Sequence, residues 1–432
     1  MASLRRAPSV ARWIPATGFV LLGATVAGGL IAEAAGAELG TATPPLLYRL
    51  DPAFALQAVA VAGMLAAGAA LAPRLCSDRV CPLAFGACAL ALGLVLRLGV
   101  ALARGGGWDS WWAVYSPGEI EAASEYLPAL PALDLGLHAF LDRFAELGPS
   151  LPVNAVGHPP GLLTVIHLLG VESAPTLAAL TIGIGVLSVP LAYVLARQLV
   201  GEPRARLATL LYAFAPSAVL HGATSADALY ATLALAAAIP LAARGRSRLL
   251  GAPALAVASF FSYANLAIGA WATVVRAWRG ELRRAIVQAL ACAAAVVAFY
   301  LTLYLLSGFD PIGAVGSAES VYREGVAAGR PYGFWLFGAP AAFLIAAGLP
   351  ITWYALRALG QRHGAAVALF TVLAVAAVLG FSKGETERIY LYLVPLLCIA
   401  AATELPELRM RAVLVALAVQ ALATELLFST IW

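Results

Sequence analysis

Long apolar stretches, separated by shorter polar ones, make up most of this chain. A membrane-spanning helix needs about 20 mostly apolar residues, with a usual range of about 17–25. This rule predicts spanning helices at residues 14–35, 53–73, 82–103, 175–197, 207–222, 226–243, 284–306, 334–357, 364–381, 388–403 and 411–430.

Two further apolar segments do not fit a simple crossing. The stretch 161–170, which follows His158, is too short to span and predicts a re-entrant or interfacial helix. Residues 249–275 fit either one long spanning helix or two short helices.

The composition supports the same class of protein. Hydrophobic residues make up 62% of the chain and charged residues 12%, and the mean hydropathy is +0.87. A soluble protein carries about a quarter charged residues. We therefore expect an all-α fold: one polytopic transmembrane helical bundle over residues 1–432, with about 11–13 membrane helices and no cleavable signal peptide.

The rarer residue types narrow the functional classes. Nearly all basic residues are arginine, with Lys383 as the single lysine. This bias is typical of a GC-rich genome and is no sign of nucleic-acid binding. The five cysteines form neither a disulfide framework nor a metal-binding pattern.

The arginines predict the orientation, because cytoplasmic loops of membrane proteins are enriched in basic residues. Arg5, Arg6 and Arg12 place the N-terminus in the cytoplasm, and Arg74 and Arg79 place the second loop there. We expect a multi-pass plasma-membrane protein in which 161–170 and 249–275 each enter and leave by one face. Four polar stretches then share the extracytoplasmic face: residues 104–174, 221–227, 307–333 and 382–388.

The large outer loop, residues 104–174, contains a predicted amphipathic surface helix at 133–147. Its charged and polar residues are expected to be solvated, away from the apolar face. The apolar face consists of Leu133, Leu137, Phe140, Leu141, Phe144 and Leu147, and the polar residues are Asp134, His138, Asp142 and Arg143. Earlier in the loop, Trp108, Trp111, Trp112 and Tyr115 fit either an interfacial aromatic belt or a substrate platform.

Three carboxylates upstream of that helix are candidate general bases: Asp109, Glu121 and Glu125. Glu121 and Glu125 are four residues apart and share a face if the segment is helical. The competing interpretation is that these are ordinary solvated loop acids.

Other polar residues lie at three predicted helix starts. His158, in the sequence Gly157-His158-Pro159-Pro160-Gly161, lies at or beside a helix N-terminus. Free N–H groups there favour an anion such as phosphate, although the motif also fits a plain helix start. Asp227 begins another span, where Ser225 as a cap and Asp227 as a complement to the helix dipole form the alternative.

A third start carries Lys383 and Arg388, which are suited to bind a lipid phosphate. Charges that merely end a helix are the alternative. Glu385, Arg330 and Tyr332 complete a possible vestibule, and interfacial anchoring explains the last two nearly as well.

Two of these motifs resemble the membrane glycosyltransferases of the GT-C superfamily. In that superfamily an acidic motif in the first large outer loop precedes a Pro-Pro-Leu-type helix start at about this spacing. The matching residues are Ser124-Glu125-Tyr126-Leu127 and His158-Pro159-Pro160-Gly161-Leu162. Asp227 resembles the second acidic position. The usual acidic pair is Ser124-Glu125 here and two spans precede the usual first helix, so Glu125, Glu121 and Asp109 all remain candidates for the catalytic carboxylate.

The resemblance implies transfer of a sugar from a polyprenyl-phosphate-linked donor to a glycan, lipid or protein acceptor at the outer face. Direct displacement inverts the anomeric centre. The resemblance implies no cofactor besides this donor substrate, and a divalent metal is possible but not required.

Two alternatives remain open at this point. A secondary transporter or lipid flippase would carry charges near the bilayer midplane and internal symmetry, and Arg97 is the main charge inside a predicted span. A catalytically inactive relative that binds membrane lipid or a partner is the other.

Overall fold

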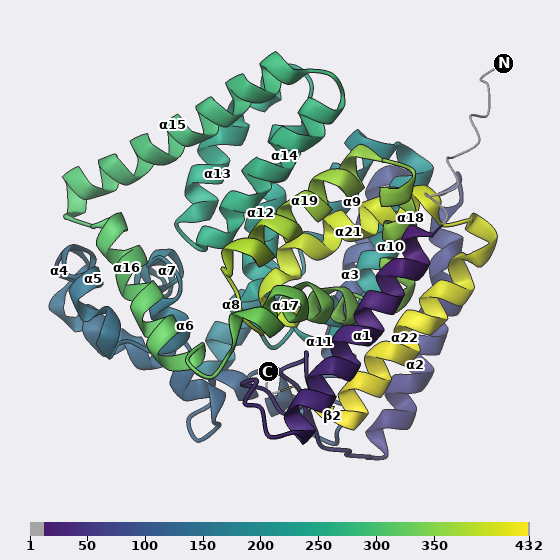
Figure 1. Cartoon of the computed structure of the whole chain (residues 1–432), viewed down its shortest axis with the longest axis horizontal. Helices are drawn as coiled ribbons and strands as arrows, with labels where there is room; N and C mark the ends of the chain where they lie inside the picture. The colour runs from purple at the N-terminus through teal and green to yellow at the C-terminus, as the bar shows by residue number, and fades with distance from the viewer. Residues whose placement is uncertain (1–12, 431–432) are drawn as a thin grey trace.

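The computed structural model describes residues 13–430 and is all-α, with 76% helix (Figure 1). The predicted cytoplasmic anchors Arg5, Arg6 and Arg12 lie outside the described residues. One short antiparallel pair joins β1 (Arg49–Leu50) to β2 (Phe428–Ser429).

Within residues 13–430, seven helical segments are long and apolar enough to cross a membrane, which indicates a multi-pass membrane protein. Each coincides with a span expected from the sequence. They are α1 (Ile14–Ala34), α2 with η2 (Gln57–Cys76), α3 (Pro82–Val100), α8 and α9 (Ala174–Gly185 and Ser188–Val200), α15 (Leu282–Ser307), α20 to α21 (Thr386–Glu404), and η12 with α22 (Glu407–Leu427).

The expected span 334–357 is instead a pair of helices, α17 (Tyr332–Ala346) and α18 (Leu349–Gly360), bent by 114°. Gly348 stands at the bend with φ 118°, a backbone conformation that favours glycine. If the bent pair is one crossing, the number of candidate spans rises to eight.

The other expected spans form shorter helices. The segment 207–222 is divided at Ala215, because Pro216 disfavours helical geometry in the residue before it. The resulting helices are α10 (Glu202–Phe214) and α11 (Pro216–Leu220), while α12 (Asp227–Ala242) and α19 (Gly364–Leu379) have 16 residues each.

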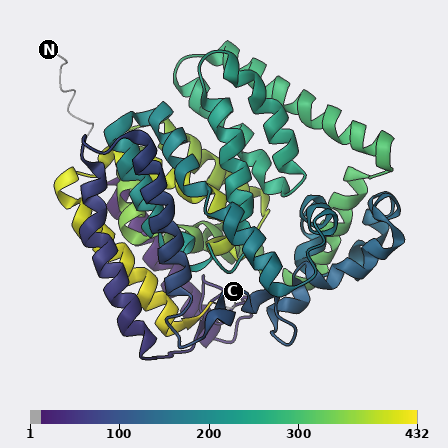
Figure 2. The ribbon, with the colours of Figure 1, turned by 180° about the vertical axis from the view of Figure 1, so that it is seen from behind.

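Residues 249–275 form two short helices rather than one span. These are α13 (Gly251–Ser259) and α14 (Leu266–Trp278), preceded by η8 (Arg246–Leu250) and joined by η9 (Tyr263–Asn265). Both pack against α15, and the three form a lobe beside the main bundle (Figures 1 and 2). Only 11% of the apolar stretch of α15 is buried, so this helix presents apolar side chains outward.

The centre of the bundle is the segment Thr386–Glu404, of whose apolar stretch 89% is buried. It contains α20 (Thr386–Ile389), η11 (Tyr390–Leu393) and α21 (Val394–Glu404), and α21 packs against α10, α18 and α19. The charged residues at its N-terminal end are therefore held by packing on all sides.

The outer loop folds into short pieces instead of the single helix expected at 133–147. Gly136, with φ 88°, ends η6 (Leu127–Leu135), and Arg143 separates α4 (Leu137–Asp142) from α5 (Phe144–Leu147). The expected apolar face is nevertheless correct, because Leu133, Phe140, Leu141 and Phe144 are buried in one cluster and Asp134, His138, Asp142 and Arg143 are exposed.

The rest of the loop is also built from short helices of three to eight residues. These are η3 (Trp108–Trp111), η4 (Ala113–Tyr115), η5 (Glu121–Ser124), η7 (Gly148–Ser150), α6 (Val153–Val156) and α7 (Gly161–Leu168). The helix α16 (Pro311–Val321) packs against α5 and α6 and continues into a π-helix, η10 (Tyr322–Val326), which leads back to the bundle.

The two ends of the bundle differ in character. At one end Arg206 donates to the carbonyls of Leu75, Ser77 and Val80, and Arg204 donates to the carbonyl of Leu405. This draws three basic loops together. At the other end, Arg104 donates to Asp51 and to the carbonyl of Phe428 and so ties the outer loop to the strand pair.

Candidate functional site

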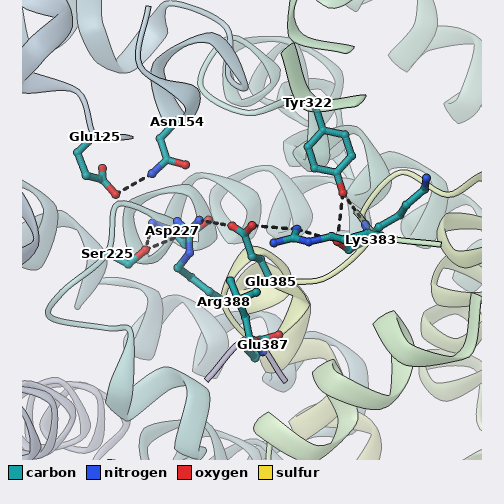
Figure 3. Close-up of polar contacts among 11 residues, drawn as sticks. Glu125, Asn154, Ser225, Asp227, Tyr322, Lys383, Glu385, Glu387 and Arg388 are labelled. Carbon is teal, nitrogen blue, oxygen red and sulfur yellow. Dashed lines mark hydrogen bonds and ion pairs between the residues drawn. The ribbon is translucent and has the colours of Figure 1, made fainter. Parts of the chain in front are cut away.

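A buried ion-pair cluster joins the starts of α12 and α20 (Figure 3). Arg388 Nη1 donates to Asp227 Oδ2 at 2.8 Å, and Arg388 Nη2 donates to Glu385 Oε2 at 3.1 Å. The side chains of Arg388 and Asp227 are 6% and 5% exposed. Burial strengthens this pairing and makes the loss of either partner costly.

Ser225 completes the surroundings of Asp227. Its hydroxyl donates to Asp227 Oδ2 at 2.6 Å and accepts the backbone N–H of Asp227 at 3.1 Å. The residue at the N-cap position of α12 is Ala226. The alternative in which Ser225 is the N-cap is therefore wrong. Asp227 belongs to an ion pair as well as to a helix start.

Arg330 supplies a second guanidinium. Its Nη1 donates to Glu385 Oε1 at 3.1 Å and to the carbonyl of Lys383 at 2.8 Å. Glu385 therefore bridges two arginines, and the two carboxylates of the cluster compensate the two positive charges. Arg388, expected to bind a phosphate, already has two carboxylate partners.

The loop before α20 holds Lys383 in a fixed backbone position. Gly380, Gly384 and the non-glycine Glu385 all have positive φ angles, of 64°, 92° and 61°. Tyr322, from the π-helix, accepts the Lys383 N–H at 2.6 Å and donates to its carbonyl at 3.4 Å. The Lys383 side chain points away from the Arg388 cluster (Figure 3). Among residues 13–430 it forms no ion pair.

Glu125 is buried next to this cluster, with 1% of its surface exposed. Asn154 Nδ2 donates to its Oε1 at 2.8 Å, while its Oε2 is buried without a hydrogen-bond partner (Figure 3). Burial raises the pKa of Glu125 to about 8; the positive charge of Arg388 opposes this shift and the negative charge of Asp227 adds to it. Such a carboxyl exchanges a proton near neutral pH.

The position of Glu125 follows from how its loop docks on α12. Glu125 lies just after η5, and the hydroxyl of the next residue, Tyr126, is 2.6 Å from the hydroxyl of Tyr230. Tyr230 lies one turn after Asp227 on α12, so this phenol pair brings the carboxyl of Glu125 within electrostatic range of Asp227 and Arg388.

The other two candidate bases lie in different surroundings. Glu121 is half-buried, and burial raises its pKa, with Arg388 acting in the opposite direction. The four-residue 3₁₀-helix η5 ends before Glu125, so the two glutamates do not share a face of one α-helix as expected. Asp109 is exposed on η3, and within residues 13–430 no hydrogen bond or ion pair connects it to the cluster.

The aromatic residues of the loop divide between the surface and the interior. Trp108 is 68% exposed, whereas Tyr115 is buried and its hydroxyl donates to Thr181. The indole N–H of Trp111 donates to the carbonyl of Leu98 and thereby anchors η3 to α3.

His158 lies beside the phenol pair, with its ring centroid 4.7 Å from that of Tyr230. Burial lowers its pKa to about 4, so the imidazole is neutral at pH 7 and its buried Nδ1 has no hydrogen-bond partner. The helix α7 begins only at Gly161, whose N–H donates to the carbonyl of Phe260. A phosphate-binding role for His158 stays a prediction. Because the imidazole is neutral, it would contact a phosphate through a hydrogen bond and not through an ion pair.

Two expected vestibule residues behave differently. Arg330 is buried and belongs to the ion-pair cluster, so its role in a vestibule stays a prediction. Tyr332 is exposed and its hydroxyl donates to the carbonyl of Val378, which fits the anchoring alternative. Arg97, the charge inside an expected span, donates to the carbonyl of Gly185 and to the hydroxyl of Ser188. It thereby supplies a hydrogen-bond partner for a backbone carbonyl at the break between α8 and α9.

Sequence reasoning missed Asn154, Tyr322 and Glu387. Asn154 is the one polar side chain in the apolar stretch 151–156, a signal that could have drawn attention. Glu387 is fully buried, with Oε1 accepting the N–H of Leu47 at 2.6 Å. Leu47 belongs to the segment between α1 and α2, so this segment packs at the same end of the bundle as Glu387. There the hydroxyl of Tyr48 lies 2.9 Å from Nε2 of His221.

The cluster and its surroundings offer a proton-exchanging carboxyl, Glu125, and a charge-compensated set of ion pairs. Among the described residues, no three His, Cys, Asp or Glu side chains are arranged to hold a metal ion. No protein-family model, curated protein or solved structure matches this chain.

Proposed function

We propose that this protein is a membrane glycosyltransferase that uses a polyprenyl-phosphate-linked sugar. The observation that carries the proposal is Glu125: a buried carboxyl with one oxygen held by Asn154 and the other free. The resemblance of the Glu125 and His158 segments to the GT-C superfamily supports the same reaction class.

In the proposed reaction, Glu125 is the catalytic base. Its Oε2 takes the proton of the acceptor hydroxyl while the hydroxyl oxygen forms a bond to the anomeric carbon. The bond between that carbon and the phosphate oxygen breaks, and its electron pair leaves with the lipid phosphate. The displacement inverts the anomeric centre, and because phosphate leaves as a stable anion, a divalent metal is possible without being required.

Lys383 is the better candidate for the donor phosphate. Lys383 is half-buried and forms no ion pair among residues 13–430, whereas Arg388 is engaged by Asp227 and Glu385. In this proposal Arg388 organises the site and favours the ionised form of Glu125, whose pKa it lowers.

We place the outer loop on the extracytoplasmic face of a plasma membrane, with the N-terminus in the cytoplasm. The meeting of the basic loops around Arg204 and Arg206 at the end opposite the site supports this orientation. The short apolar helices α12 and α19, the bent pair α17–α18 and the broken segments α10–α11 and α13–α14 then belong to the membrane region with the seven candidate spans, for a total of about 11–13 membrane helices.

The test compares Glu125→Gln with Glu121→Gln and Asp109→Asn in isolated membranes supplied with lipid-phosphate-linked sugars. The glycan that is lost from the cell envelope of a deletion strain indicates which sugars to supply. Glu125→Gln should lower transfer by at least about 10²-fold, because a positioned base contributes that much. Asp109→Asn should retain activity, since Asp109 is exposed and outside the cluster. Activity retained in Glu125→Gln would remove Glu125 as the base.

A transporter or flippase is the second candidate, and the sharp bend between α17 and α18 favours it, because transporters use broken helices. In proteoliposomes a flippase should move the lipid-linked sugar across the bilayer without any acceptor and irrespective of Glu125→Gln. A transferase consumes the donor only when acceptor is present. An inactive relative does neither.

A further inference from the structure

The carboxyl of Glu125 receives a single hydrogen bond within the described part of the chain. Asn154 Nδ2 donates to Oε1 at 2.8 Å, and the buried Oε2 receives none. Asn154 lies on the one-turn helix α6, whose Ala155 and Val156 are buried in the core of the outer loop. This packing fixes the backbone from which the amide reaches Glu125.

The amide distinguishes the two oxygens of Glu125 in both protonation states. When the carboxylate is ionised, the N–H of Asn154 occupies Oε1 and leaves Oε2 to accept a proton. When the carboxyl is protonated, the N–H donor at Oε1 disfavours a proton there, so the proton resides on Oε2. Oε2 is therefore the atom that exchanges protons.

We infer that Asn154 is a positioning residue that orients Glu125 so that Oε2 alone takes the proton of the acceptor hydroxyl. The inference rests on the proposed function, in which Glu125 is the base. The other groups with an electrostatic effect at Glu125 are Arg388, Asp227 and Glu121, together with the phenols Tyr115, Tyr126 and Tyr230. All of them stay in place when only residue 154 is changed.

The experiment measures transfer as a function of pH in the wild type, Asn154→Ala and Asn154→Asp. The hydrogen bond from Asn154 lowers the pKa of Glu125, so its loss should move the acidic limb of the profile to higher pH by about one unit. Asn154→Asp should move the limb further, because a second carboxyl then faces Glu125. The KM for the donor should stay the same.

Ser150→Ala is the matched control, since Ser150 is an exposed residue of the same loop that donates only to the carbonyl of Leu147. The acidic limb of the pH profile of Ser150→Ala should coincide with that of the wild type. If Asn154→Ala lowers the rate equally at every pH and leaves the limb in place, Asn154 acts only through loop structure and the inference is wrong.

An infrared titration of the Glu125 carboxyl band, assigned by its absence in Glu125→Gln, separates this inference from the proposed function. A band that titrates at higher pH in Asn154→Ala supports the inference even if no lipid-phosphate-linked sugar is a donor, in which case only the proposed function fails. A band that titrates identically in both proteins overturns the inference whatever the activity.

Discussion

At the scale of single residues, Glu125 determines how the protein responds to pH. Its pKa is raised from 4.5 to about 8, mainly by burial. If the carboxylate is the base, transfer should fall as the pH drops below about 8, because protonation removes the acceptor oxygen. An activity profile that rises toward acid would instead indicate that the neutral carboxyl is the working form.

The same pKa predicts a pH-dependent stability. The folded protein binds this proton more tightly than the unfolded chain, so the stabilising contribution is complete below pH 4.5 and is lost as the pH rises through about 8. Glu125→Gln should therefore gain several degrees in unfolding temperature relative to wild type at pH 9, and little at pH 5. Thermal unfolding in detergent measures this. Glu119→Gln, an exposed glutamate of the same loop, is the control, and an equal gain in both variants would contradict the assignment.

The Arg388 cluster predicts a large effect of one substitution. Arg388→Met leaves Asp227 and Glu385 buried without this cation and should destabilise the protein by about 3–5 kcal/mol. Arg323→Met removes an exposed ion pair with Glu319 and should have an effect near zero. Chemical or thermal unfolding of both variants is the measurement. Equal stabilities would mean that Arg388 is not paired as described.

At the scale of elements, the sequence predicts helix positions well and helix breaks poorly. Apolar length sufficed for α1, α3 and α15, because lipid-facing helices need only be long and hydrophobic. The bend at Gly348 depends on packing against Leu417 and Pro216, which lie far away in the chain. A sequence pattern contains no information on such contacts.

The candidate site shows the same limit. Asp227 and Arg388 could be selected from their charge at helix starts and Glu125 as a carboxylate of the outer loop, and the structure brings the three together. The roles of Asn154 and Tyr322 could not be predicted, because each acts through hydrogen bonds to a single residue distant in the sequence. The exposure of Asp109 likewise depends on where the loop docks.

The bend between α17 and α18 yields a prediction about Gly348. A Cβ at this position would lie 2.5 Å from Leu417 Cδ2, and φ is 118°. Gly348→Ala should therefore destabilise the protein by more than about 1 kcal/mol. Gly333→Ala, in the first turn of α17 with nothing within 4 Å of its Cβ, should be neutral or slightly stabilising. The unfolding temperatures of the two variants decide the matter, and equal values would mean that the bend does not need glycine.

At the scale of the whole molecule, the two ends of the bundle should lie on opposite sides of a membrane. Cys81 is exposed near the basic end, and Ala123 is exposed on the outer loop. In intact cells an impermeant maleimide should label Ala123→Cys in a Cys81→Ser background. The wild type should be labelled at Cys81 only after permeabilisation. The reverse result would invert the proposed orientation.

The pairing of Asp227 with Arg388 joins residues 161 positions apart, which constrains how the chain is assembled during synthesis. When α12 leaves the ribosome, the cation that compensates Asp227 has not yet been translated. The segment Thr386–Glu404, which brings it, is also the most buried of the candidate spans. The centre of the bundle is therefore supplied by one of the last segments to be translated. A chain that stops before residue 388 leaves the Asp227 carboxylate without this cation, and an unpaired charge is costly in a membrane.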